Sequence, residues 1–119
     1  MKWYLKAADQ GDVYAQYELG IMYAEGHGGP HRDAEAVKWL RKAADQGDAH
    51  AQNNLGFLYA TGRGVPQDYI EAHMWFNLAG AQGDTDAMKN RDLVAAKMTP
   101  AQLSEAQKLA REWKPKSGQ

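Results

Sequence analysis

WLRKAADQGD, at residues 39–48, is one of three copies of a single motif in this 119-residue sequence. The other copies are WYLKAADQGD at residues 3–12 and WFNLAGAQGD at residues 75–84, so successive copies start 36 residues apart. An ungapped comparison of residues 3–38 with residues 39–74 finds 19 identities in 36 positions. A fixed period of this length is typical of arrays of helical repeats.

The residue types also favour helices over strands. The sequence has twenty alanines, whereas valine, isoleucine and threonine together number nine. Alanine is the best helix former, and the three β-branched residues are the ones that strands favour. We therefore predict an all-α fold.

Helix stops divide each period into two helices. A Gly-Asp pair closes every copy of the motif: the glycine suits a left-handed helix end, and Asp12, Asp48 and Asp84 can each cap the helix that follows. The breaker-rich connectors GHGGP and GRGVP, at residues 26–30 and 62–66, then separate the first helix from the second. Each unit is thus predicted to be an αα-hairpin. The first helices are expected at about 13–25 and 49–61, and the second helices are expected to begin near Asp33 and Asp68.

Residues shared by the repeats are predicted to build the core. An apolar stripe runs along each first helix, and Gly20 and Gly56 interrupt it. Because glycine inside a helix costs about 1 kcal/mol relative to alanine, these two positions predict close approach of a neighbouring helix. Trp3, Trp39 and Trp75 recur with the period, and we expect them to pack between neighbouring hairpins.

The two ends of the array differ from its centre. Arg91 and Asp92 replace the Leu-Gly pair of the first two units, as a solvent-facing terminal repeat requires. Thr99, Pro100 and Gln102 then predict a capping box that starts a last helix. We predict one domain over residues 1–113, with a partial N-terminal helix at 1–10, repeat units at about 13–48 and 49–84, a degenerate capping unit at 85–113 and a flexible tail at 114–119.

The repeat resembles the Sel1-like repeat (SLR) family, relatives of the tetratricopeptide repeats. Residues 51–84 carry nearly all of its motif: Ala51, Leu55, Gly56, Tyr59, Gly62, Gly64, Val65, Asp68, Ala72, Trp75, Ala79, Gly83 and Asp84. Gly80 stands where the family has alanine, and the unit at 15–48 departs at Gly29 and Arg32, so that Asp33 is expected to cap its helix one residue late. The resemblance implies a right-handed α-solenoid, commonly bacterial, that acts as an adaptor or scaffold with no shared catalytic residues.

Composition and motifs exclude several kinds of function. The net charge of −1 gives no long-range attraction for nucleic acid or an anionic membrane, and the absence of cysteine excludes disulfides and thiol chemistry. We find no apolar run long enough to span a bilayer, no signal peptide in the sequence as given, and no phosphate-binding or zinc-protease motif. We therefore expect a soluble, non-enzymatic protein without cofactor, either cytoplasmic or periplasmic. His27 and His31 could in principle share a metal ion, but a solvated loop is the better interpretation.

Positions that differ between the repeats predict the binding surface. Shared residues build the scaffold, so the variable positions on the first helices are free to specify a partner. By resemblance to tetratricopeptide arrays, these helices line the concave groove. The candidates are Tyr14, Tyr17, Glu18, Ile21, His50, Asn53, Asn54, Phe57, Lys89 and Asn90, of which Ile21 and Phe57 fit the core equally well.

The sequence thus predicts an interaction module that binds a peptide or protein in its groove. Tyr14, Tyr17 and Phe57 would supply apolar anchors, while His50, Asn53, Asn54 and Lys89 would bond the ligand's backbone or carboxylate. The alternative is a structural segment of a longer array that self-associates, as a homodimer, through its uncapped N-terminal helix.

Overall fold

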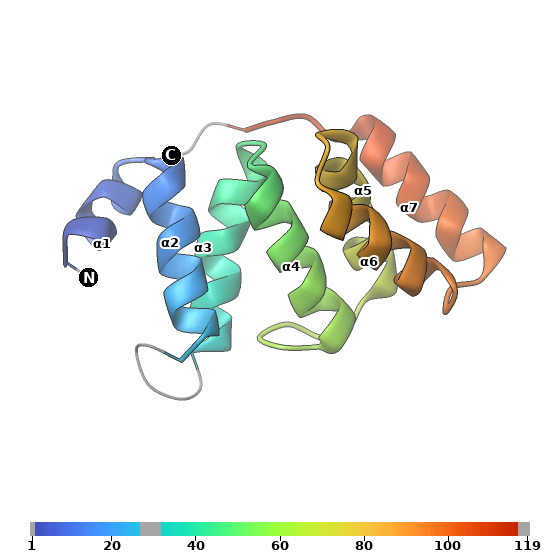
Figure 1. The fold of residues 1–119 in the computed structure, drawn as a ribbon, viewed down its shortest axis with the longest axis horizontal. Helices are drawn as coiled ribbons and strands as arrows, with labels where there is room; N and C mark the ends of the chain where they lie inside the picture. Colours follow the sequence, from blue (N-terminus) through green and yellow to red (C-terminus); the bar gives the residue numbers. More distant parts are fainter. Residues whose placement is uncertain (1, 27–31, 117–119) are drawn as a thin grey trace.

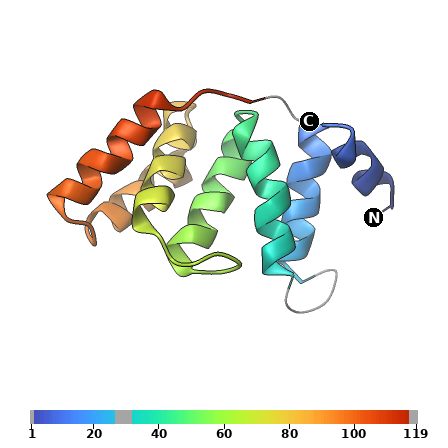
Figure 2. The same ribbon diagram turned by 180° about the vertical axis from the view of Figure 1, so that it is seen from behind.

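The computed structural model describes residues 2–26 and 32–116, and the regular secondary structure within them is all helical. Within them lie α1 (Lys2–Asp9), α2 (Val13–Ala24), α3 (Asp33–Asp45), α4 (Ala49–Thr61), α5 (Tyr69–Ala81), α6 (Thr85–Ala95) and α7 (Pro100–Glu112). The helices α2, α4 and α6 form one layer and α3, α5 and α7 the other, with α1 against α2 at one end (Figure 1). The opposite view shows the second layer in front (Figure 2). The predicted all-α repeat solenoid is confirmed.

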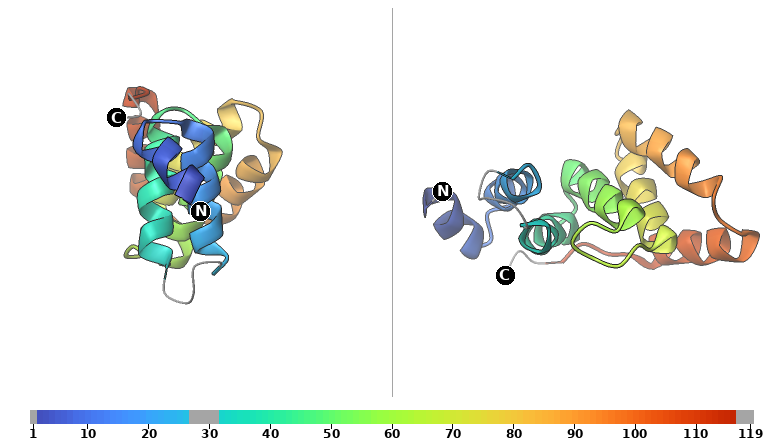
Figure 3. Two further views of the ribbon diagram at one scale, coloured as in Figure 1. Left: turned by 90° about the vertical axis from the view of Figure 1, so that its left-hand side faces the viewer. Right: turned by 90° about the horizontal axis from the view of Figure 1, so that it is seen from below.

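The array is longer than it is wide, with extents of 44 × 29 × 22 Å. Successive helix pairs follow one another along the long axis, and α7 packs against α5 in the last part of the array (Figure 3). None of the described helices combines the length and the apolar character needed to cross a bilayer.

The predicted helix caps are confirmed. The carboxylates of Asp12, Asp48 and Asp84 each accept the backbone N–H of the residue three positions later, at 2.8–2.9 Å. The glycine before each cap has a φ of 95–102°, the left-handed conformation that glycine adopts most readily. At the start of α7, Thr99 and Gln102 form the predicted capping box.

The two helices of each hairpin approach most closely at Gly20 and Gly56, which lie inside α2 and α4. A Cβ atom at Gly20 would lie 2.5 Å from Cγ of Leu40, and one at Gly56 would lie 2.7 Å from Cε1 of Phe76. Both partner side chains are at most 1% exposed, so neither has room to withdraw. The close approach predicted from the sequence is therefore confirmed.

A ladder of glutamines, which the sequence did not suggest, joins one repeat to the next. Gln16 and Gln52 are fully buried, and each donates to a carbonyl eight residues earlier, at 3.0 and 3.2 Å. Those two carbonyls belong to the preceding repeat, whereas the glutamine oxygens accept within their own hairpin: Gln46 donates to Gln16 at 2.6 Å, and Gln82 donates to Gln52 at 3.1 Å. A buried polar group without a partner costs about 1–3 kcal/mol, so these bonds fix the register of neighbouring hairpins.

The prediction that Trp3 belongs to the core is wrong. Trp39 and Trp75 are 2% exposed, whereas Trp3 is 67% exposed. Trp39 packs against Ala8, in α1, and against residues of α2, so the preceding pair of helices buries it. The described chain has no such pair ahead of α1, and Trp3 has only Tyr4 as an aromatic neighbour, 5.1 Å away between ring centroids.

The prediction that Asp33 caps α3 is also wrong. Asp33 is the first residue of the helix, and its carboxylate accepts two hydrogen bonds from Arg63, at 2.8 and 3.2 Å. Arg63 also donates to the carbonyl of Ala24 at 2.9 Å. The carboxylate therefore ties the connector of the second unit to the first.

The chain after α7 turns back along the array (Figure 2). The backbone N–H of Lys116 donates to the carbonyl of Asp45, at 2.6 Å. The expected flexible tail therefore contacts α3 as far as Lys116, while residues 117–119 lie outside the described part of the chain.

Candidate interaction face

Two clefts open on the face formed by α2, α4 and α6. The first, which we call the polar cleft, has a volume of about 560 Å³ and lies where α2, α4 and the start of α6 meet. Amide, carboxylate and hydroxyl side chains dominate its lining, which consists of Tyr17, Ala49, His50, Asn53, Asn54, Gln82, Gly83, Asp84, Thr85 and Asp86.

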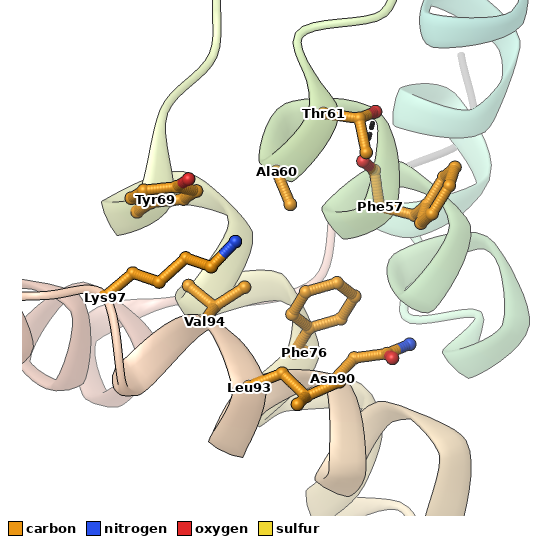
Figure 4. Close-up of a pocket in the computed structure, with 9 residues that line it drawn as sticks. All are labelled: Phe57, Ala60, Thr61, Tyr69, Phe76, Asn90, Leu93, Val94 and Lys97. Carbon is orange, nitrogen blue, oxygen red and sulfur yellow. Dashed lines mark hydrogen bonds between the residues drawn. The ribbon is translucent and has the colours of Figure 1, made fainter.

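The second, which we call the apolar cleft, lies between α4 and α6 and has a volume of about 190 Å³. Its lining consists of Phe57, Ala60, Thr61, Tyr69, Phe76, Asn90, Leu93, Val94 and Lys97. Phe76 rises from α5 between the two helices, with Ala60 on one side and Val94 on the other (Figure 4). Phe57 is 46% exposed and Leu93 is 67% exposed, so apolar surface stays open to solvent here.

A pair of asparagines joins the two clefts. Asn90 of α6 donates to the side-chain oxygen of Asn53 of α4, at 3.1 Å. Asn53 lines the polar cleft and Asn90 lines the apolar cleft, so the two clefts adjoin at this bond. Both side chains keep further donors and acceptors that a ligand could use.

Tyr17 and His50 form the α2 side of the polar cleft. Their ring centroids are 6.0 Å apart. Burial raises the pKa of the Tyr17 hydroxyl, and the negative charges of Glu18 and Asp48 raise this pKa further. Nδ1 of His50 lies 3.8 Å from a carboxylate oxygen of Asp84, whose other oxygen caps α6. The cleft is therefore an electronegative site.

Six of the ten candidate residues line these clefts. Tyr17, His50, Asn53 and Asn54 surround the polar cleft, and Phe57 and Asn90 surround the apolar one. Ile21 and Phe57 each fitted either the core or the binding surface. In the structure Ile21 packs partly buried against the core, whereas Phe57 is open to solvent.

The other candidate residues lie apart from the clefts. Tyr14 is 59% exposed and packs near Tyr4, with 6.5 Å between ring centroids. Glu18 is half-buried and Lys89 is exposed, and neither lines a cleft. The cation expected for a ligand carboxylate is therefore not at the polar cleft.

The sequence comparison missed the second-helix contribution to the apolar cleft. Tyr69 and Phe76 of α5 line it, at positions where the preceding unit has Asp33 and Leu40. These positions differ between the two units, so variation on the second helices is the sequence signal that points to them. Lys97 was also missed, because it follows α6, where the repeat pattern has already degraded.

Two groups with shifted pKa values, His73 and Glu71, lie outside both clefts. Burial lowers the pKa of His73, which is 4% exposed in α5, and the positive charge of Arg91 lowers it further. Burial likewise raises the pKa of Glu71 in the same helix. In these two groups the shifts reflect packing between helices, so they mark no acid–base pair at the surface.

The described residues do not gather metal ligands. Across residues 2–26 and 32–116, no three His, Asp or Glu side chains are placed to hold one ion together. His27 and His31, considered above as metal ligands, lie outside these residues.

The chain consists of repeated helix pairs that share core residues and differ in the exposed residues of α2, α4 and α6. This organisation defines a helical-repeat protein. The sequence matches the Sel1 repeat over residues 1–12, 13–48 and 49–84, and the chain belongs to this family. Sel1 repeat proteins are generally protein–protein interaction scaffolds and are generally not enzymes. None of the curated proteins matches the sequence.

Two solved structures are similar to the chain. One is a protective antigen of uropathogenic Escherichia coli strains with an SLR fold: it is 36% identical, has a TM-score of 0.90, and matches 94% of this chain. The other is a Sel1 repeat protein from Oxalobacter formigenes: it is 43% identical, has a TM-score of 0.72, and matches 77% of this chain. The matched regions make up only 24% and 38% of those proteins, respectively.

Proposed function

We propose that the chain binds an extended peptide segment of another protein in the groove made by the polar and apolar clefts. The observation that carries the proposal is the adjacency of the two clefts, one with exposed Phe57 and Leu93, the other with Asn53 and Asn54. An apolar anchor surrounded by amide groups suits a peptide, which offers side chains and backbone hydrogen bonds together.

Affinity capture with a paired set of variants tests this proposal. The native chain, the groove variant Asn54→Ala with Phe57→Ala, and the control Tyr14→Ala with Gln107→Ala would each be used on lysate from the source organism. Each variant removes one amide and one aromatic ring, but the control residues line neither cleft. Circular dichroism would first show equal helicity.

We expect a protein that the native chain and the control both retain and that the groove variant loses. Equal retention by all three would contradict binding in the groove. Retention lost only in the control would move the binding surface to the region of Tyr14 or α7.

A second candidate is self-association through the N-terminal helix, and the exposure of Trp3 favours it. The equivalent residue Trp39 is buried against α1 and α2, and a second copy could supply such a helix pair for Trp3. Light scattering should then detect a dimer at micromolar concentration that Trp3→Glu dissociates. A native chain that stays monomeric at this concentration would contradict it.

A further inference from the structure

The charges around the two clefts specify the chemistry of the ligand. Building on the function proposed above, we infer that the groove selects an extended peptide carrying a large apolar residue and, two positions away, a lysine or arginine. The apolar side chain occupies the apolar cleft, and the cationic side chain occupies the polar cleft.

Carboxylates dominate the charge of the polar cleft. Asp84 and Asp86 line it, while Glu18 and Asp48 lie close enough to Tyr17 for their charges to act on its hydroxyl. One Asp84 oxygen caps α6, and the other lies 3.8 Å from His50, too far for a hydrogen bond. This oxygen can accept from a ligand, and no lysine or arginine is among the residues that line the cleft.

Two helix N-termini oppose this negative charge but do not cancel it. The cleft lies at the starts of α4 and α6, and each helix end carries the equivalent of about half a positive charge. Four carboxylates against two half-charges leave roughly three negative charges near the cleft. The caps Asp48 and Asp84 also occupy a backbone donor each, which leaves fewer N–H groups for an anionic ligand.

The apolar cleft has the opposite character. Leu93 lies beside the buried ring of Phe76, and the exposed ring of Phe57 lies at the edge of the cleft (Figure 4). An aliphatic or aromatic side chain would therefore cover apolar surface that is now exposed. Among the residues that line the two clefts, Lys97 is the one lysine or arginine, and it lines the apolar cleft. Its ammonium group lies 5.9 Å from the Tyr69 ring centroid. Its charge disfavours a basic side chain in this cleft, so the apolar and basic residues of the peptide cannot exchange places.

The geometry of α4 sets the spacing of the two ligand residues. Asn53 in the polar cleft and Phe57 in the apolar cleft are four residues apart, or about 6 Å along a helix. Side chains on one face of an extended peptide recur every second residue, about 6.6 Å apart. An apolar and a basic residue separated by one position therefore reach both clefts.

Selection from a displayed library of random linear nonapeptides tests the inference with no assumption about the natural partner. The full native chain would be the immobilised target, and enriched peptides would be resynthesised for fluorescence anisotropy. Two variants probe the clefts, Asp86→Lys for charge and Phe57→Ala for the apolar anchor. Their controls are Glu105→Lys and Tyr14→Ala, exposed residues that line neither cleft.

We expect enriched peptides to share an apolar residue and a lysine or arginine two positions apart. Asp86→Lys should weaken binding about fivefold or more, Phe57→Ala about tenfold or more, and each control less than about twofold. Raising the salt concentration should weaken the native complex more than the Asp86→Lys complex.

The outcomes separate the ligand chemistry from the groove itself. Peptides without a basic residue, weakened by Phe57→Ala but not by Asp86→Lys, would overturn the inferred chemistry and leave the proposed groove standing. No enrichment, or binding that neither variant changes, would overturn both.

Discussion

Trp3 in α1 and Trp39 in α3 begin the same sequence motif, yet one is 67% exposed and the other 2%. Trp39 is covered by α1 and α2, whereas the described chain has no helix pair to cover Trp3. The motif is thus buried where the two helices before it, one from its own hairpin and one from the preceding unit, are present. The contrast teaches that burial in this fold depends on neighbouring helices rather than on the motif alone.

Replacing the two tryptophans tests the contrast most strongly. Trp39→Ala should lower the free energy of unfolding by about 3–5 kcal/mol, because it empties a packed site. Trp3→Ala should change it by less than about 0.5 kcal/mol, as an exposed residue does. Urea unfolding of both variants, followed by circular dichroism, measures the difference. Equal losses would show that Trp3 is buried in solution.

Glycine substitutions compare a central hairpin with the terminal one. Gly56→Ala would place a Cβ 2.7 Å from the buried Phe76 ring, and it should cost about 1–3 kcal/mol of stability. At Gly80 the Cβ would be 3.0 Å from Cγ of Met88, a partly exposed and flexible side chain. Helix propensity should then offset the contact, so Gly80→Ala should stay within about 1 kcal/mol of native. A costlier Gly80→Ala would place the tighter packing at the end of the array.

His73 makes the junction between α5 and α6 sensitive to pH. Burial and Arg91 lower its pKa in the folded protein below the unfolded value of 6.5, while Asp92 partly opposes this. The unfolded chain therefore binds the proton more readily. The stability that neutral His73 contributes is present above pH 6.5 and is lost as the pH falls through the folded pKa. His73→Gln should remove this part of the pH dependence.

The test is to measure the free energy of unfolding from pH 8 to pH 5 for the native chain and for His73→Gln. The difference between the two proteins at each pH gives the contribution of His73. Glu71, whose pKa shift is of opposite sign, is present in both proteins and cancels from the difference. Parallel profiles would mean that His73 does not titrate differently in the two states.

The smallest loss of stability is expected at Arg63, in the connector that bonds the second unit to the first. Arg63→Ala removes the bonds to Asp33 and to the Ala24 carbonyl, but the side chains of Arg63 and Asp33 are 41% and 34% exposed. Solvent screening should limit the loss to about 1 kcal/mol or less, and 1 M salt should reduce it. Arg111→Ala is the control, because Arg111 is an exposed arginine of α7 and lies outside the connectors. An equal loss in both variants would show no special role for the connector.

The sequence predicted the local features of the fold because their causes lie within a few residues. Aspartate caps, left-handed glycines and the capping box at Thr99 each depend on one helix end. The two predictions that were wrong depended on distant partners: Trp3 has no covering helices, and Asp33 bonds Arg63 from the next unit. The glutamine ladder was missed for the same reason, since its bonds join residues 30 positions apart.

The candidate site was partly foreseen. Variation on the first helices pointed to Phe57, Asn53 and Asn90, which the structure places around adjoining clefts. It also pointed to Tyr14 and Lys89, which vary on the same helices but lie away from both clefts. Helical spacing places residues on a face, but it does not say where neighbouring helices leave a cleft.

Site-specific photocrosslinking tests the proposed groove most directly. The photoreactive residue p-benzoylphenylalanine would replace Phe57 in one sample and Tyr14 in another, in the organism that encodes the chain. We predict that position 57 forms a crosslink to a partner protein and that position 14 does not. A crosslink from position 14 alone, or one that joins two copies of the chain, would contradict the groove as the binding site.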